Sequence, residues 1–199
     1  MGAFYSTLFI IGMFMLVVWG LDHRQPVKPP SFSQIQSAAI KGDVEAERNL
    51  GYSYYIGRSV AKNDAEAVKW WKKAAAQGDL ASCNSIGIAY AAGRGVEKNY
   101  DTAIEWWRKA ADKGNPEAQF TLGQIYFDDS FGKKDKPRAL DWLRKAAAQG
   151  YYEAQSRLST AYINGDSLPF ENAQDLKWVQ QEADDGNGVA RAFLKKLKQ

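Results

Sequence analysis

The chain has 199 residues, enough for one ordinary domain or for an array of short repeats with an appendage. Its 45% hydrophobic and 25% charged residues are typical of a folded chain and exclude a disordered one. The net charge is only +3, with basic and acidic residues mixed along the chain, so we expect no nucleic-acid partner. The single cysteine, Cys83, excludes an internal disulfide framework and a cysteine-based metal cluster.

The N-terminal region carries an uncharged, mostly apolar run from Phe4 to Leu21. At the helical rise these 18 residues span about 27 Å, close to the roughly 30 Å hydrocarbon core of a bilayer. The alternative is a cleavable signal peptide, which needs a basic residue before the run and small residues at the cut. No Lys or Arg precedes the run, and Val18-Trp19-Gly20 does not fit a cleavage site. The sequence therefore predicts an uncleaved transmembrane anchor over residues 4–21.

Residues 22–32 contain three prolines, which predicts an extended linker rather than a helix. Arg24 and Lys28 follow the anchor and nothing basic precedes it, which favours a cytoplasmic repeat domain by the positive-inside rule. Asp22 weakens this bias. We expect a single-pass protein of a bacterial inner membrane, with the side of the repeat domain left open between cytoplasm and periplasm.

A period of 36 residues organises the rest of the chain, residues 33–199. Glycine, alanine, tyrosine and tryptophan each recur in phase, at Gly42, Gly78, Gly114, Gly150 and Gly186; Ala39, Ala75, Ala111, Ala147 and Ala183; Tyr54, Tyr90, Tyr126 and Tyr162; and Trp70, Trp106, Trp142 and Trp178. Repeats of this length indicate stacked supersecondary units, because one unit cannot bury its apolar face alone. These columns are interpreted as scaffold.

Each unit contains two amphipathic helical stretches. In the first unit Ala46, Leu50 and Tyr54 share one helix face, and an alanine- and tryptophan-rich stretch follows. The recurring glycine suits the left-handed position after a helix, and the Asp or Asn beside it can cap the next one. The prediction is an all-α, right-handed α/α superhelix (solenoid) preceded by one transmembrane helix. Its four helix–turn–helix repeats are units 38–73, 74–109, 110–145 and 146–181, with a C-terminal cap at 182–199.

The repeat resembles a known family. The pattern A-x-x-x-L-G-x-x-Y-x-x-G-x-G-V, then A-x-x-W-x-x-K-A-A-x-x-G, is similar to the Sel-one-like repeat, a relative of the tetratricopeptide repeat. The second unit shows it best, with Ile86-Gly87, Tyr90, Gly93-Arg94-Gly95-Val96, Ala103, Trp106 and Lys109-Ala110-Ala111. Asp129, Ser159 and the stretch Ser167 to Phe170 depart from the pattern. They predict altered turns near residues 128–136 and 165–172.

The resemblance implies an adaptor that gathers partner proteins, often at membranes. It leaves two alternatives open: an envelope immunity protein that neutralises a secreted toxin, and a cell-wall carbohydrate-binding factor. A cysteine-rich branch of the family is linked to β-lactam binding, but the lone Cys83 places this chain outside it. The sequence has no phosphate-binding loop, metalloprotease motif or nucleophile elbow, so we expect no catalysis, no cofactor, no metal and no small-molecule substrate.

Specificity for a partner is expected in the columns that vary between repeats. One such stripe follows the first helix of each unit, and by resemblance these helices line a concave surface that would hold a protein or peptide. Tyr, Phe and Arg, which are enriched at interface cores, are frequent in it. Some of its members could instead pack against the adjacent hairpin. The predicted partner-binding residues are Arg48, Tyr52, Tyr55, Asn84, Ile88, Phe120, Gln124, Phe127, Ser156 and Thr160.

Overall fold

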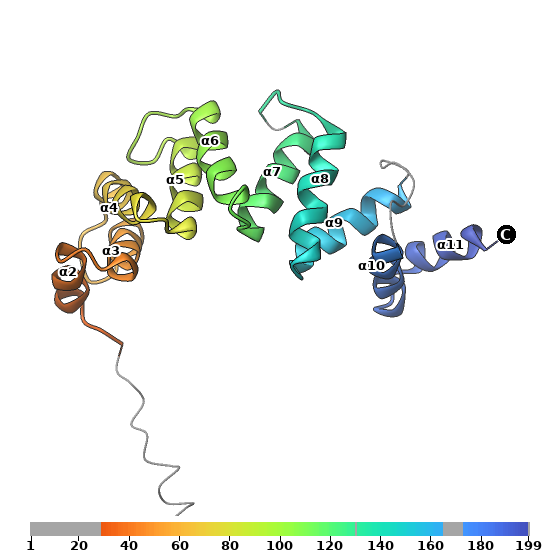
Figure 1. The fold of residues 1–199 in the computed structure, drawn as a ribbon, viewed down its shortest axis with the longest axis horizontal. Helices are drawn as coiled ribbons and strands as arrows, with labels where there is room; N and C mark the ends of the chain where they lie inside the picture. The colour runs from red at the N-terminus through yellow and green to blue at the C-terminus, as the bar shows by residue number, and fades with distance from the viewer. Residues whose placement is uncertain (1–28, 130, 165–172, 199) are drawn as a thin grey trace, which may run out of the picture. The chain divides into compact units, whose positions relative to one another are not determined.

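The computed structural model describes residues 29–129, 131–164 and 173–198, and every regular element in these ranges is an α-helix. This confirms the predicted all-α class. The helices, shown in Figure 1, are α2 (Phe32–Ile40), α3 (Val44–Ile56), α4 (Asp64–Ala76), α5 (Leu80–Ala92), α6 (Tyr100–Ala111), α7 (Pro116–Asp128), α8 (Lys136–Ala148), α9 (Tyr152–Ile163), α10 (Ala173–Asp184) and α11 (Gly188–Leu197).

The helices pack in chain order within one compact unit that starts at Phe32. They form the hairpins α3–α4, α5–α6, α7–α8 and α9–α10, and α4, α6 and α8 each also pack against the first helix of the next hairpin. Helix α2 packs against α3, and α11 packs against α10 and α9. The helical hairpins predicted from the 36-residue period are therefore present and consecutive.

No helix within the described ranges is long and apolar enough to cross a bilayer. The predicted anchor at residues 4–21 and most of the predicted linker lie outside those ranges. The rewritten turn near residues 165–172 lies outside them as well. These three features remain predictions.

Tight turns connect the hairpins as the recurring glycine predicts. The five glycines of this column all have positive φ, from 84° at Gly150 to 106° at Gly186, a region that only glycine enters at little cost. At the α4–α5 turn the next residue, Asp79, begins the following helix. Its carboxylate accepts a hydrogen bond of 2.6 Å from the Ser82 backbone N–H, which satisfies one of the unpaired donors at the helix start.

The two helices of a hairpin meet where a glycine of the first faces a large side chain of the second. A Cβ at Gly51 would lie 2.4 Å from Trp71 Nε1, and one at Gly123 would lie 2.7 Å from Leu143 Cδ2. Such distances leave no room for a methyl group, so the glycine is required for the close approach. In the fourth unit Ser159 replaces the glycine and the smaller Val179 takes the position that Trp71 has in the first, with both side chains buried.

The tryptophans that recur at positions 70, 106, 142 and 178 are less deeply buried than the residues that directly follow them. Trp70 and Trp178 are buried, whereas Trp106 and Trp142 are only half-buried. Three of the four carry a lysine ammonium from the next helical turn over the ring, as Lys145 does over Trp142 at 4.1 Å. The centre of each hairpin is instead filled by the following residue, which is Trp71, Trp107, Leu143 or Val179.

Candidate partner-binding surface

An exposed row runs along the first helices of the four hairpins. Its members are the middle positions of the predicted stripe, spaced by one repeat: Tyr52, Ile88, Gln124 and Thr160. Tyr52 is 36% exposed and Ile88 is 44% exposed, and Gln124 and Thr160 are exposed too. The same backbone position therefore presents an aromatic ring, an aliphatic chain, an amide and a hydroxyl in succession. We call these four residues the exposed row.

The N-terminal end of the row is held by contacts within its own hairpin and to the next one. The Tyr52 hydroxyl lies 3.0 Å from Ser85 Oγ, and its ring meets Trp71 edge-on at 5.4 Å between centroids. One turn earlier, Arg48 Nη1 donates to Asp79 Oδ2 at 2.7 Å. These contacts fix the rotamers of Arg48 and Tyr52, so a partner would lose little side-chain entropy on binding them.

Two further aromatic members are half-buried beside the row. Tyr55 packs against Trp71 with 5.5 Å between ring centroids, and its hydroxyl accepts a hydrogen bond from Arg94. Phe120 packs against Tyr151 of the following hairpin at 5.2 Å. Tyr55 therefore packs within its own hairpin and bonds to the next one, and Phe120 packs against the next hairpin.

Asn84 and Phe127 are not available to a partner, because they are buried, with 5% and 9% exposure. Arg157 of the next hairpin covers Phe127, with its guanidinium carbon 4.3 Å from the ring centroid, and also pairs with Asp128. Packing between hairpins, which the helical period alone does not specify, therefore removes Phe127 from the surface. Ser156 is half-buried, and its carbonyl accepts from Thr160 Oγ1 at 3.0 Å.

A second set of contacts, which the helical period does not predict, joins two columns 18 residues apart. The cation that follows the buried tryptophan position donates to the tyrosine hydroxyl of the next repeat. The contacts are Lys72 to Tyr90 at 3.1 Å, Arg108 to Tyr126 at 3.1 Å and Arg144 to Tyr162 at 3.0 Å. The cations and the tyrosines each recur every 36 residues, so their constant separation of 18 residues was a signal in the sequence for these contacts.

The last of these contacts includes a buried carboxylate. Asp175 is fully buried, accepts from the Tyr162 hydroxyl at 2.6 Å and lies 3.6 Å from Arg144 Nε. Burial, and then the hydrogen bond to Asp175, raise the pKa of Tyr162 above its ordinary value. The corresponding position in the first three hairpins is alanine, at Ala67, Ala103 and Ala139.

Stacked helical hairpins of constant length define the chain as an α-solenoid of the tetratricopeptide-like class. The chain belongs to the Sel1 repeat family, whose model matches residues 44–79, 80–115 and 116–151. Each matched segment starts at the first helix of a hairpin and ends at the cap residue of the next one.

Solved structures of this family are similar to the chain. A Sel1 repeat protein from Oxalobacter formigenes is 31% identical with a TM-score of 0.71; the match covers 83% of this chain and 48% of that one. A protective antigen of uropathogenic Escherichia coli with the same repeat fold is 32% identical with a TM-score of 0.66, over 83% and 36% of the two chains. The chain therefore spans about half or less of these two relatives.

A Pseudomonas aeruginosa immunity protein is 23% identical with a TM-score of 0.49, over 82% of this chain and 62% of that one. This likeness is too low to support an argument about function. No curated protein matches the chain.

Proposed function

We propose that the chain is a non-catalytic scaffold that binds a partner protein or peptide along the exposed row of its first helices. The observation that carries this proposal is the row itself: one repeat position stays exposed in all four hairpins while its chemistry changes at every step. A solenoid presents such positions side by side, so a partner that spans several repeats can contact one residue of the row in each repeat.

The row has an apolar end and a polar end. Tyr52 and Ile88 are exposed at the α3–α5 end, and Ile56, one turn beyond Tyr52, is 66% exposed. Gln124 and Thr160 occupy the α7–α9 end. Aromatic and aliphatic side chains dominate the centres of protein interfaces, and polar ones their rims. The partner should therefore place its apolar anchor against α3 and α5.

Photo-crosslinking in cells tests this proposal with the full chain. A photoreactive amino acid at position 88 or 124 should crosslink one partner, and the same group at Lys69 on α4, whose side chain is 62% exposed, should not. Ile88→Asp should abolish the crosslink formed from position 124. The matched control is Leu176→Asp on α10, which changes a side chain of similar exposure, 40%, away from the row. Equal crosslinking from positions 69 and 88 would refute the proposal.

We also propose that residues 4–21 anchor this scaffold in a membrane, as their length and lack of charge indicate. The full chain should stay in the membrane fraction after alkaline carbonate extraction. A chain without residues 4–21 should appear in the supernatant. Extraction of the full chain would contradict the anchor and leave the partner-binding proposal untouched.

The described tryptophans give little support to the carbohydrate-binding alternative. Sugar binding usually needs an exposed aromatic face. Trp70, Trp71, Trp107 and Trp178 are buried, and the half-buried Trp106 and Trp142 lie under lysine ammonium groups.

A further inference from the structure

A groove opens between the second and third hairpins, on the side of α7 away from the exposed row. Tyr126, at its centre, is two residues from Gln124 and so points about 200° around the helix from it. The groove has a volume of about 540 Å³ and lies between α6, the end of α7 and the start of α8. A second cavity of about 380 Å³ adjoins it along α8, and the two share Arg108, Tyr126 and Arg138.

The turn that lines the groove departs from the repeat. In the second hairpin the turn lies directly on the preceding helix, and a Cβ at Gly95 would be 2.3 Å from the backbone of Asp64. In the third hairpin the positive φ moves to Gly132, which has nothing within 4 Å of its Cβ position. Phe131 packs against Tyr100 instead, at 4.2 Å between ring centroids. This aromatic pair stands where the second hairpin has its direct backbone contact.

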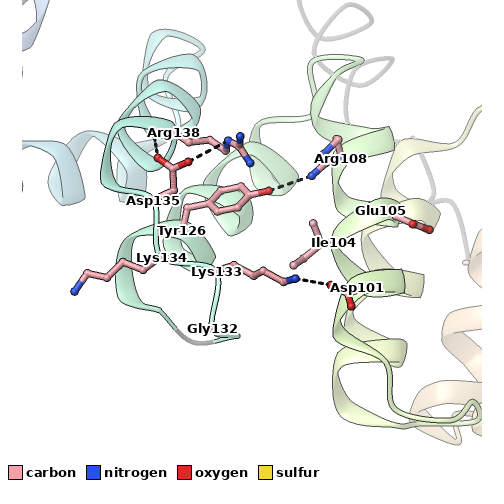
Figure 2. Close-up of a pocket in the computed structure, with 10 residues that line it drawn as sticks. All are labelled: Asp101, Ile104, Glu105, Arg108, Tyr126, Gly132, Lys133, Lys134, Asp135 and Arg138. Carbon is pink, nitrogen blue, oxygen red and sulfur yellow. Dashed lines mark hydrogen bonds and ion pairs between the residues drawn. The ribbon is translucent and has the colours of Figure 1, made fainter.

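Two guanidinium groups converge on the centre of the groove. Figure 2 shows Arg108 from α6 and Arg138 from α8 on either side of Tyr126, with Glu105 and Lys134 directed away. Arg108 donates to the Tyr126 hydroxyl at 3.1 Å, and the Arg138 guanidinium carbon lies 5.2 Å from the centroid of the same ring.

Two of the carboxylates that line the groove are paired with cations, and the third, Glu105, is directed away from the centre of the groove (Figure 2). Asp101 pairs with Lys133 at 3.0 Å, and Asp135 caps α8 and lies 3.5 Å from Arg138 Nε. Within the described ranges Arg108 has no carboxylate partner; its hydrogen bond goes to a neutral phenol. In the described ranges Arg108 is thus a cation in the groove that forms no ion pair with the acids lining it.

The next repeat shows which group pairs with an arginine at this position. Arg144 and Tyr162 occupy the positions of Arg108 and Tyr126 one repeat later, and there the fold supplies an internal carboxylate, Asp175. At the corresponding position beside Arg108 the residue is Ala139, which supplies none. Arg144 and Tyr162 therefore contact an internal carboxylate, whereas the equivalent Arg108 and Tyr126 have an alanine at that position.

We propose that the groove binds an acidic segment of a partner protein, with one of its carboxylates held between Arg108, Arg138 and the Tyr126 hydroxyl. Guanidinium groups favour carboxylates because their paired N–H donors match the two oxygens. Along α8 the two cavities extend from Arg138 to Lys145, about 10 Å, which accommodates roughly three residues of an extended chain. This site is independent of the proposed function at the exposed row.

The test uses the full chain in a non-ionic detergent and a fluorescein-labelled peptide of alternating glutamate and serine, with fluorescence anisotropy as the readout. The glutamate peptide should bind, and a glutamine–serine peptide of equal length should not. Arg108→Gln and Arg138→Gln should each weaken binding about tenfold or more, the effect of losing one charge-assisted contact. Lys69→Gln on α4 is the matched control, since it removes one exposed charge away from the groove.

A second variant introduces an internal carboxylate beside Arg108. Ala139→Asp places a carboxylate where the next repeat has Asp175, and it should abolish peptide binding while circular dichroism shows an unchanged helix content. If this variant does not fold, the two arginine variants still decide. The proposal is overturned by equal binding of the glutamine peptide, by unchanged binding to both arginine variants, or by tighter binding of a phosphoserine peptide. Ile88→Asp should leave this binding unchanged, so failure here is distinguishable from failure of the exposed-row proposal.

Discussion

The contact between Gly87 of α5 and Trp107 of α6 offers a sharp test of how the hairpins are packed. A Cβ at Gly87 would lie 2.6 Å from Trp107 Nε1, 2.7 Å from Cε2 and 2.8 Å from Cδ1. Trp107 is only 4% exposed, so its ring cannot move outward without disturbing the core. Gly87→Ala therefore forces two helices apart or the ring out of its rotamer.

Two opposing effects set the magnitude. Overpacking a well-filled core costs typically about 1–3 kcal/mol. Alanine in a helix interior is favoured over glycine by roughly 0.5–1 kcal/mol. Because the added methyl group meets a rigid ring rather than the end of a flexible chain, we expect the overpacking to dominate, and Gly87→Ala should lower the free energy of unfolding by about 1–2 kcal/mol.

Urea unfolding followed by far-UV circular dichroism measures this effect. The control is Gly188→Ala in the first turn of α11, where nothing lies within 4 Å and φ is not positive, so stability should stay constant or rise slightly. Trp107→Val removes the ring, as Val179 does in the fourth unit, and should couple favourably to Gly87→Ala by about 0.5–3 kcal/mol in a double-mutant cycle. If Gly87→Ala behaves like the control, the steric argument is refuted.

Three further outcomes follow from buried or bridging polar groups. The pKa of Tyr162 is raised in the fold, so its contribution is complete below the unfolded value near 10 and is lost as pH rises above it. Thermal stability should therefore fall more steeply above pH ~10 in the wild type than in Tyr162→Phe; parallel curves would contradict this. Cys83 is 1% exposed, and burial raises the pKa of its thiol. A maleimide should therefore label it only as fast as the fold opens. Labelling at the rate of a free thiol would contradict the buried position of Cys83. Asp79→Asn keeps the helix cap and loses only the ion pair with Arg48. In urea unfolding it should lower the free energy of unfolding by less than about 1 kcal/mol, and Asp79→Ala should lower it by about 1–2 kcal/mol. Equal losses of stability would show that the cap contributes nothing.

Several features of the fold could be predicted because they depend on local chemistry repeated in phase. The positive φ of the turn glycines and the helix-capping Asp and Asn residues follow from residue types that few other conformations suit. The departure at Asp129 also has a visible consequence, since this residue adopts a left-handed conformation, with φ 57°, where earlier repeats use glycine. Its carboxylate accepts from the Lys134 backbone N–H at 3.0 Å and so stabilises the altered turn.

The candidate surface was only partly predictable. A helical period identifies a stripe but not the angle at which a helix meets its neighbour, so it could not separate the exposed Ile88 from the buried Asn84. The same limitation applies to tryptophan: the regular column was apparent from the sequence, but the residue after it fills the core. Burial in a solenoid is decided by the tilt between hairpins, which depends on side chains from two repeats at once.

The sequence alone determined the helical hairpins, their turns and their order, because each repeat carries its own caps, glycines and apolar faces. Only the tertiary structure showed which members of the stripe reach solvent, that Arg144 and Tyr162 enclose Asp175, and that Arg108 lacks such a carboxylate beside an open groove. The reason is distance along the chain. The residues that make these contacts come from different helices and often from different repeats, and they meet only when the hairpins stack.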